Sequence, residues 1–227
     1  MKAFSLVSVG SRSFNPESIT RLDNCANERH LHLLYIVLDG PERYNMSVFH
    51  GLHGAVARSA ASRSARNYVI SVGLPQNRLL YWAEAIRDLP ALGRILVSLN
   101  NLFFANRSFR NLCLAQVYSN LKPRLARLGV KNQRDPRVLR ASSYLLEELA
   151  FKAAAFEEGP YCAELLPVPE MPIVRDLYSS NWITLKRERL NKFEVLICDG
   201  VKAPVSQCYV GLEKSADRVH IGKEDGG

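Results

Sequence analysis

The sequence predicts an α/β fold, in which a mainly parallel sheet is flanked by helices. The first observation is a nearly continuous apolar run at residues 32–38 (HLLYIVL), as expected of a strand that is buried on both faces. The second is a shorter apolar run at residues 4–9, and the third is a helix signal between the two runs. Strand, helix and strand in this order are typical of a parallel crossover unit.

The first helix is expected to begin at Asn15 and Pro16. Asn15 can cap the helix, Pro16 suits its first turn, and Glu17 favours its positive end. The second strand is expected to stop at Asp39, which Gly and Pro follow. Because ligands bind at the carboxyl ends of parallel strands, residues 8–13 and Asp39 are predicted to share one rim of the sheet.

The rest of the chain continues the α/β pattern. Further helices are expected at residues 56–68, 91–104, 109–128, 135–156 and 175–178. Further strands are expected at residues 78–82, 163–166, 193–198 and 207–210. Gly73 and Gly129 are predicted to end helices. With 227 residues and no linker, the sequence predicts one domain over residues 1–222 and a short polar tail at 223–227.

The composition is that of an ordinary globular protein, with 47% hydrophobic and 23% charged residues. The formal net charge of +8 favours a polyanionic partner, although a merely basic protein is the alternative. No run of 18 apolar residues exists, so no membrane span is expected. The five cysteines are odd in number and form no C-x-x-C pair, which indicates free thiols and a cytoplasmic location.

Several classes of site lack their sequence signature. There is no H-E-x-x-H motif, no cysteine pair and no glycine-rich phosphate loop, so neither a metal nor a nucleotide cofactor is expected. There is no G-x-S-x-G motif, and the five histidines form no recognisable catalytic triad.

Ser8 is the first candidate for chemistry. It lies at the predicted carboxyl end of the first strand, two residues before Gly10 and shortly before a helix start. The loop amides and the helix N-terminus could stabilise an anionic oxygen there. A polar residue at this position is also common in α/β proteins without any catalytic role.

The second candidate is a pair on the helix at residues 135–156. Tyr144 and Glu148 are four residues apart and therefore share a helical face. Such a pair can relay a proton or anchor a substrate ammonium group. The alternative is an ordinary amphipathic helix with a half-buried tyrosine and a solvated glutamate.

The third candidate is a basic helix. Arg58, Arg63 and Arg66 alternate with alanine and serine, and such a surface can neutralise phosphates. A solvated basic face is the alternative. Lys122, Arg124 and Arg127 form a second basic cluster.

In their order along the chain, these features resemble the tRNA-dependent cyclodipeptide synthases, which are related to the catalytic domains of class I aminoacyl-tRNA synthetases. The similar segments are LVSVGSRSF at residues 6–14, YIVLD at residues 35–39, the arginine helix, and YLLEE at residues 144–148. The resemblance covers about residues 4–173. Two features depart from the family: residues 166–173 contain no tyrosine, and Ser11 follows the loop glycine where one subgroup has asparagine.

The resemblance implies a single Rossmann-like domain without metal or cofactor that forms a cyclic dipeptide from two aminoacyl-tRNAs, and the protein is expected to be a monomer. It implies an aminoacyl-enzyme on Ser8, with Tyr144 and Glu148 as the other catalytic residues. The implied substrate-binding residues are Gly10, Ile36, Leu38 and Asp39, and the implied tRNA-binding residues are Arg58, Arg63 and Arg66. Two alternatives stay open: a non-catalytic RNA-binding module, and a serine acyltransferase or hydrolase for small esters.

Overall fold

The computed structural model describes residues 1–157, 159–168, 171–179, 182–183, 185 and 193–198, and the backbone of 205–209. Its sheet has the strand order β3-β2-β1-β4-β5-β6. The strands are β1 (Lys2–Val7), β2 (His32–Val37), β3 (Leu79–Tyr81), β4 (Tyr161–Leu166), β5 (Phe193–Ile197) and β6 (Val205–Tyr209). β1 to β5 run parallel and β6 is antiparallel to β5. This is the Rossmann strand order, so the predicted fold class is confirmed. The predicted tail at 223–227 lies outside the described residues.

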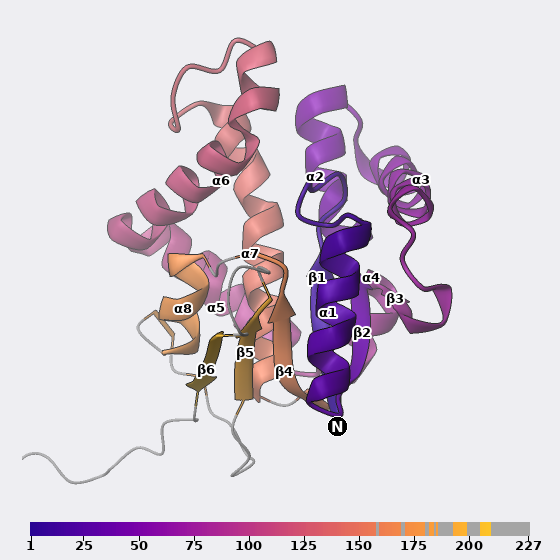
Figure 1. Ribbon diagram of the computed structural model, residues 1–227. Helices are drawn as coiled ribbons and strands as arrows, with labels where there is room; N and C mark the ends of the chain where they lie inside the picture. Colours follow the sequence, from indigo (N-terminus) through magenta and orange to yellow (C-terminus); the bar gives the residue numbers. More distant parts are fainter. Residues whose placement is uncertain are drawn as a thin grey trace, which may run out of the picture.

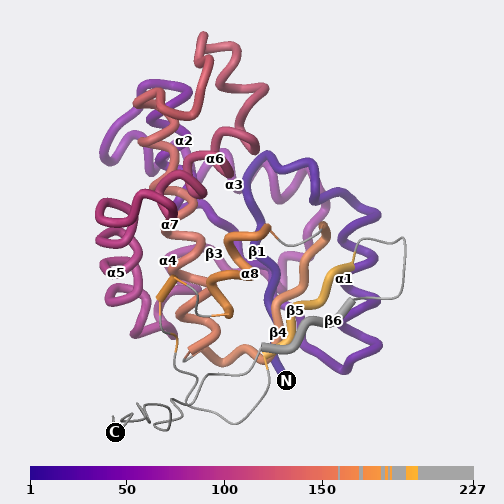
Figure 2. The backbone as a smooth tube through the Cα atoms, turned by 90° about the vertical axis from the view of Figure 1, so that its left-hand side faces the viewer, coloured from indigo at the N-terminus to yellow at the C-terminus, as the bar shows by residue number. Residues whose placement is uncertain are grey.

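Helices cover both faces of the sheet, as Figures 1 and 2 show. They are α1 (Pro16–Glu28), α2 (Asp39–His50), α3 (Gly54–Val72), α4 (Trp82–Ala85), α5 (Leu92–Ala105), α6 (Arg107–Arg127), α7 (Pro136–Glu157) and α8 (Pro172–Tyr178). Figure 2 shows the strands between α1 on one side and α5 and α7 on the other. None of the helices in the described part of the chain is both long and apolar enough to cross a membrane.

Alternation along the strands divides the interior into two main cores. Phe4 and Ile36 face the larger core, which contains the buried sides of α5, α6 and α7. Val7 and Tyr35 point the other way, into a core shared with α1 and α3. The period of two therefore fixes which strand residues can meet α7.

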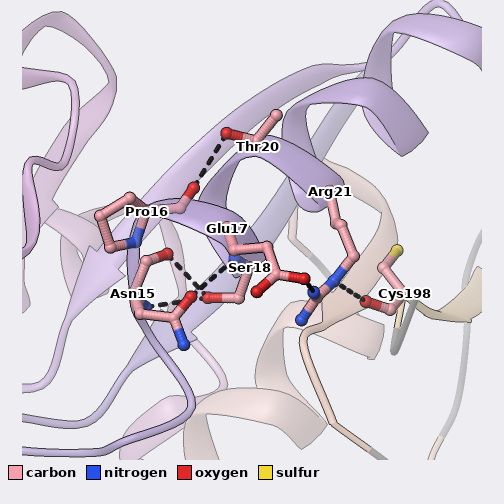
Figure 3. Close-up of polar contacts among 7 residues, drawn as sticks. All are labelled: Asn15, Pro16, Glu17, Ser18, Thr20, Arg21 and Cys198. Carbon is pink, nitrogen blue, oxygen red and sulfur yellow. Dashed lines mark hydrogen bonds and ion pairs between the residues drawn. The ribbon is translucent and has the colours of Figure 1, made fainter. Parts of the chain in front are cut away.

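The start of α1 confirms the helix signal at Asn15 (Figure 3). The Asn15 side chain accepts a hydrogen bond from the Ser18 amide at 2.9 Å, and the Ser18 hydroxyl accepts one from the Asn15 amide, also at 2.9 Å. This reciprocal capping box satisfies two amides that a helix start leaves without partners. Arg21 also donates from Nε to the Cys198 carbonyl at 3.3 Å, which ties α1 to the end of β5.

The segment after β2 differs from the sequence prediction. Asp39, Gly40 and Pro41 end the strand as expected, but they also begin α2. Proline in the first helical turn lacks an amide that would be unpaired anyway, and acidic residues there suit the positive helix end. A Cβ atom on Gly40 would come within 2.2 Å of the Trp82 side chain, so glycine is required for this close approach.

Small side chains determine how α3 packs. Ala57, Ala61, Ala65 and Val69 lie four residues apart and are all buried, which lets α3 lie close to its neighbours. The helix ends at Gly73, whose positive φ of 74° fits the predicted glycine stop. The arginines of α3 are left on the outer side.

Candidate functional site

Ser8 follows directly after β1 at the carboxyl edge of the sheet. Val7 pairs with Val37 in parallel register, and the Leu38 amide donates to the Val7 carbonyl at 3.1 Å. Ser8 and Asp39 therefore lie on the same rim, as the sequence predicts. Continued alternation after Phe4 and Leu6 directs Ser8 to the α7 side of the sheet.

A tight turn holds the loop after Ser8. The Ser11 amide donates to the Ser8 carbonyl at 3.1 Å, and Gly10 has a positive φ of 77°. A turn of this kind requires the left-handed conformation that glycine adopts at little cost. The Tyr68 hydroxyl of α3 donates to the Ser11 carbonyl and so anchors the loop from the other side. A Cβ atom on Gly10 would meet nothing within 4 Å, so the backbone conformation explains this glycine.

Tyr144 is the neighbour of Ser8 on α7. Its hydroxyl is buried, and the described residues give it no hydrogen bond of ordinary geometry. Burial raises the pKa of Tyr144 well above its usual value, the charges of Glu148 and Glu42 raise it further, and the nearby Ser8 hydroxyl opposes the rise. An unpaired buried hydroxyl costs about 1 to 3 kcal/mol, which a bound substrate could recover by hydrogen bonding.

Glu148 lies one helical turn beyond Tyr144. Burial raises the pKa of its carboxyl group, Lys152 lowers it, and Glu164 raises it. The side chain nevertheless keeps part of its surface accessible. Glu148 is not a solvated surface residue, and its raised pKa makes its carboxylate a stronger base than that of an exposed glutamate.

Glu42 is a further ionisable residue close to Tyr144, and the sequence analysis did not identify this proximity. It lies in the first turn of α2 and is only 2% exposed. The Asn45 side chain donates to its carboxylate at 2.8 Å. Burial raises the pKa of Glu42 to about 7, although the bond from Asn45 and the charge of Arg124 both lower it. The sequence places Glu42 near the rim, but its burial close to Tyr144 was not predicted because no helix was assigned at α2.

The raised pKa of Glu42 predicts a pH-dependent stability. The carboxyl group of Glu42 loses its proton near pH 4.5 in the unfolded chain and near pH 7 in the folded protein. Because the folded protein holds the proton more tightly, the free energy of unfolding falls as pH rises between these values. We expect the free energy of unfolding of the wild type to fall by about 3 kcal/mol relative to Glu42→Gln across that range. Urea unfolding at both ends of the range measures the difference, and parallel pH profiles would show that Glu42 does not titrate in this way.

Three other predicted substrate-binding residues, Ile36, Leu38 and Asp39, are held by contacts within the protein. Ile36 and Leu38 are fully buried in the larger core. Asp39 accepts hydrogen bonds from the Trp82 amide at 2.9 Å and from the Ser62 hydroxyl at 3.2 Å. Asp39 thus joins the rim to α3 and to the start of α4. A role for these residues in substrate binding stays a prediction.

The predicted tRNA-binding residues Arg58, Arg63 and Arg66 are exposed on α3. Arg63 borders a shallow hollow of about 650 Å³ lined by small and polar residues of the same helix, among them Ser59 and Asn67. The described part of the chain provides no ion pair to any of these three arginines. Their charges are therefore available to a polyanion.

The sequence analysis also did not identify two charged residues close to Glu148, namely Lys152 and Glu164. Lys152 interrupts the apolar end of α7, and Glu164 interrupts the apolar strand β4. In each case, the sequence signal that could have identified the residue was one charged side chain within an otherwise apolar run. Within the described ranges, no group of three or more His, Cys, Asp or Glu residues could hold a metal ion.

The structure resembles three solved cyclodipeptide synthases. The one from Fluoribacter dumoffii has a TM-score of 0.61 at 14% identity, with 78% of this chain and 82% of that chain covered. The one from Bacillus thermoamylovorans has a TM-score of 0.57 at 14% identity, with 83% and 84% covered. The one from Staphylococcus haemolyticus has a TM-score of 0.55 at 14% identity, with 82% and 86% covered.

Neither a protein-family model nor a curated protein sequence matches the chain. The similarity is therefore one of three-dimensional structure, over most of the length of both chains. This chain has the fold of the solved cyclodipeptide synthases.

Proposed function

We propose that this chain is a tRNA-dependent cyclodipeptide synthase, which makes a cyclic dipeptide from two aminoacyl-tRNAs. One observation carries the proposal: Ser8 lies beside the unpaired Tyr144 hydroxyl, with Glu148 one turn further along α7. The likeness in fold to proteins described as cyclodipeptide synthases supports it.

In the first step, Ser8 Oγ attacks the carbonyl carbon of an aminoacyl ester. The bond from this carbon to the ribose oxygen breaks, and the serine proton passes to the leaving ribose oxygen. The products are an aminoacyl-Ser8 ester and a free tRNA. The ester of the substrate is already activated, so the step needs no nucleoside triphosphate. The covalent intermediate divides one difficult reaction into easier ones.

Two further steps complete the product. The amine of the Ser8-bound residue attacks the ester of the second aminoacyl-tRNA, which forms a peptide bond and releases the second tRNA. The free amine of the resulting dipeptidyl group then attacks the Ser8 ester. This attack closes the six-membered ring and returns the serine hydroxyl, so the enzyme ends as it began.

Glu148 and Tyr144 have distinct roles in this scheme. The Glu148 carboxylate holds the substrate ammonium group and accepts its proton, because only a neutral amine is a nucleophile. Its raised pKa favours this transfer. The Tyr144 hydroxyl stays protonated because its pKa is raised, so it can donate to the reacting ester oxygen and relay the proton to the leaving group.

The arginines of α3 supply the surface for tRNA. Arg58→Ala with Arg63→Ala should weaken tRNA binding and reduce the slope of log affinity against log salt by about one per lost phosphate contact. The matched control is Arg87→Ala with Arg107→Ala, which removes the same charge from two exposed residues outside α3. Filter binding over a salt series measures both. An unchanged slope in the α3 variant would move the tRNA surface elsewhere, for example to Lys122, Arg124 and Arg127.

The function itself is tested by mass spectrometry of the medium of cells that produce the protein. The wild type should release diketopiperazines that are absent from cells producing Ser8→Ala, and their masses identify the joined amino acids. No such product, with tRNA binding retained, would favour a non-catalytic RNA-binding module. No product, with hydrolysis of small esters that depends on Ser8, would favour a serine hydrolase.

A further inference from the structure

A buried ion pair lies close to Glu148, one helical turn further along α7. The Lys152 ammonium group contacts the Glu164 carboxylate, and the two residues are 2% and 0% exposed. The Tyr178 hydroxyl of α8 donates to the second oxygen of Glu164 at 2.7 Å and is 2% exposed as a residue. Elements α7, β4 and α8 thus contribute one residue each to a polar cluster within the larger core.

Such a pair needs an explanation beyond stability. Taking two charges out of water costs several kcal/mol each, and apolar residues of the same volume often serve a core as well or better. The surroundings here are apolar, since Leu149, Phe151 and Phe156 of α7 are fully buried. Glu164 is held at both oxygens, by Lys152 and by Tyr178, so the position of the ammonium group is fixed.

The pair is connected to the proposed site through α7. Tyr144, Glu148 and Lys152 occur at intervals of four residues and lie on one face of the helix. Lys152 attracts the Glu148 carboxylate, whereas Glu164 repels it. Among the described residues, Tyr178 of α8 contacts Glu164, whereas Glu42 of α2 and Tyr68 of α3 act on Tyr144, at the Ser8 end of this face.

We infer that Lys152 and Glu164, held by Tyr178, are positioning residues that set the charge of Glu148 for binding the substrate ammonium group. The inference rests on the function proposed above. Lys152 opposes the rise in pKa that burial causes and so favours the ionised form of Glu148. Glu164 pairs with Lys152, so the ammonium group of Lys152 is not left to neutralise Glu148 completely. The substrate ammonium group then remains the better partner for Glu148.

Single variants should move the pH profile in opposite directions. The acid limb is the fall in the rate of aminoacyl-enzyme formation at low pH, where Glu148 becomes protonated. Lys152→Met removes the cation, so this limb should shift to higher pH. The rate should fall by about tenfold or more at neutral pH and recover at alkaline pH. Glu164→Gln frees Lys152 to neutralise Glu148, so the limb should shift to lower pH while KM for aminoacyl-tRNA rises. A merely structural pair would lower the melting temperature in both variants without opposite shifts.

Two further variants keep the test decisive. Arg43→Met breaks the other ion pair next to Glu148, in which Arg43 contacts Glu147, and should lower stability without moving the limb. Lys152→Met combined with Glu164→Leu leaves no unpaired charge, so it should fold even where a single variant does not. Its acid limb should lie between those of the two single variants.

A direct titration separates this inference from the proposed function. The Glu148 side-chain carboxyl can be followed by ¹³C NMR in glutamate-labelled protein, with Glu148→Gln for assignment. Opposite displacements in the two single variants support the inference, even if the wild type makes no cyclic dipeptide and the proposed function fails. An active wild type whose Glu148 titration is the same in all variants would overturn the inference and leave the function standing.

Discussion

Replacing Ser8 with alanine should abolish cyclic dipeptide formation, with a loss of at least about a thousandfold. The reason is that the acyl group has no other carrier: the scheme has one covalent ester, and Ser8 lies at the strand end beside Tyr144. The variant should still fold, because Ser8 is only partly buried and its carbonyl, not its side chain, accepts the turn hydrogen bond. The measurement is product formation by purified protein with charged total tRNA.

Ser5 provides a matched control in the same strand. It is fully buried, points to the opposite face of β1, and its hydroxyl has no hydrogen-bond partner among the described residues. Ser5→Ala therefore removes an unsatisfied polar atom and should raise the free energy of unfolding by about 1 kcal/mol. It should keep the activity that Ser8→Ala loses. Equal losses in both variants would indicate damage to β1 rather than loss of a nucleophile.

Replacing Glu148 with glutamine should lower the rate of aminoacyl-enzyme formation by about a hundredfold or more. The amide keeps the shape of the side chain but carries no charge, so it neither pairs with a substrate ammonium group nor accepts its proton. The burial that raises the pKa of Glu148 also strengthens its attraction to a bound cation. Rapid-quench measurements on stoichiometric charged tRNA determine the rate.

A substitution of the neighbouring Glu147 serves as a control that distinguishes a loss of catalysis from a loss of stability. It pairs with Arg43 and accepts a hydrogen bond from the Tyr44 hydroxyl at 2.9 Å, which fastens α7 to α2. Glu147→Gln should lower the free energy of unfolding by about 2 kcal/mol while the rate per folded molecule is kept. If Glu148→Gln were as active as Glu147→Gln, the ammonium-binding role of Glu148 would be wrong.

The sequence was sufficient for most of the fold because local signals agreed with the tertiary structure. Asn15 and Pro16 start α1, Gly73 ends α3, and the apolar run at residues 32–38 forms a central strand. Helix α2 was missed because Asp39, Gly40 and Pro41 also fit a turn. Only packing distinguishes the two, through the contact of Gly40 with Trp82.

The proposed site was predictable only where its parts are close in sequence. Tyr144 and Glu148 follow from helical spacing, whereas the contact of Ser8 with Tyr144 joins residues 136 positions apart and was inferred from a resemblance. The pair of Lys152 and Glu164 depends on the register of a helix against a strand, which no local pattern encodes. The Tyr68 bond to the Ser11 carbonyl is of the same long-range kind.

The central claim is that Ser8 carries an aminoacyl group, and intact-protein mass spectrometry tests it most directly. Protein mixed with total tRNA charged with amino acids and quenched rapidly should gain the mass of one aminoacyl group, and peptide mapping should place that mass on Ser8. Ser5→Ala should gain the same mass and Ser8→Ala should gain none. An adduct on another residue, or cyclic dipeptide made by Ser8→Ala, would contradict the mechanism.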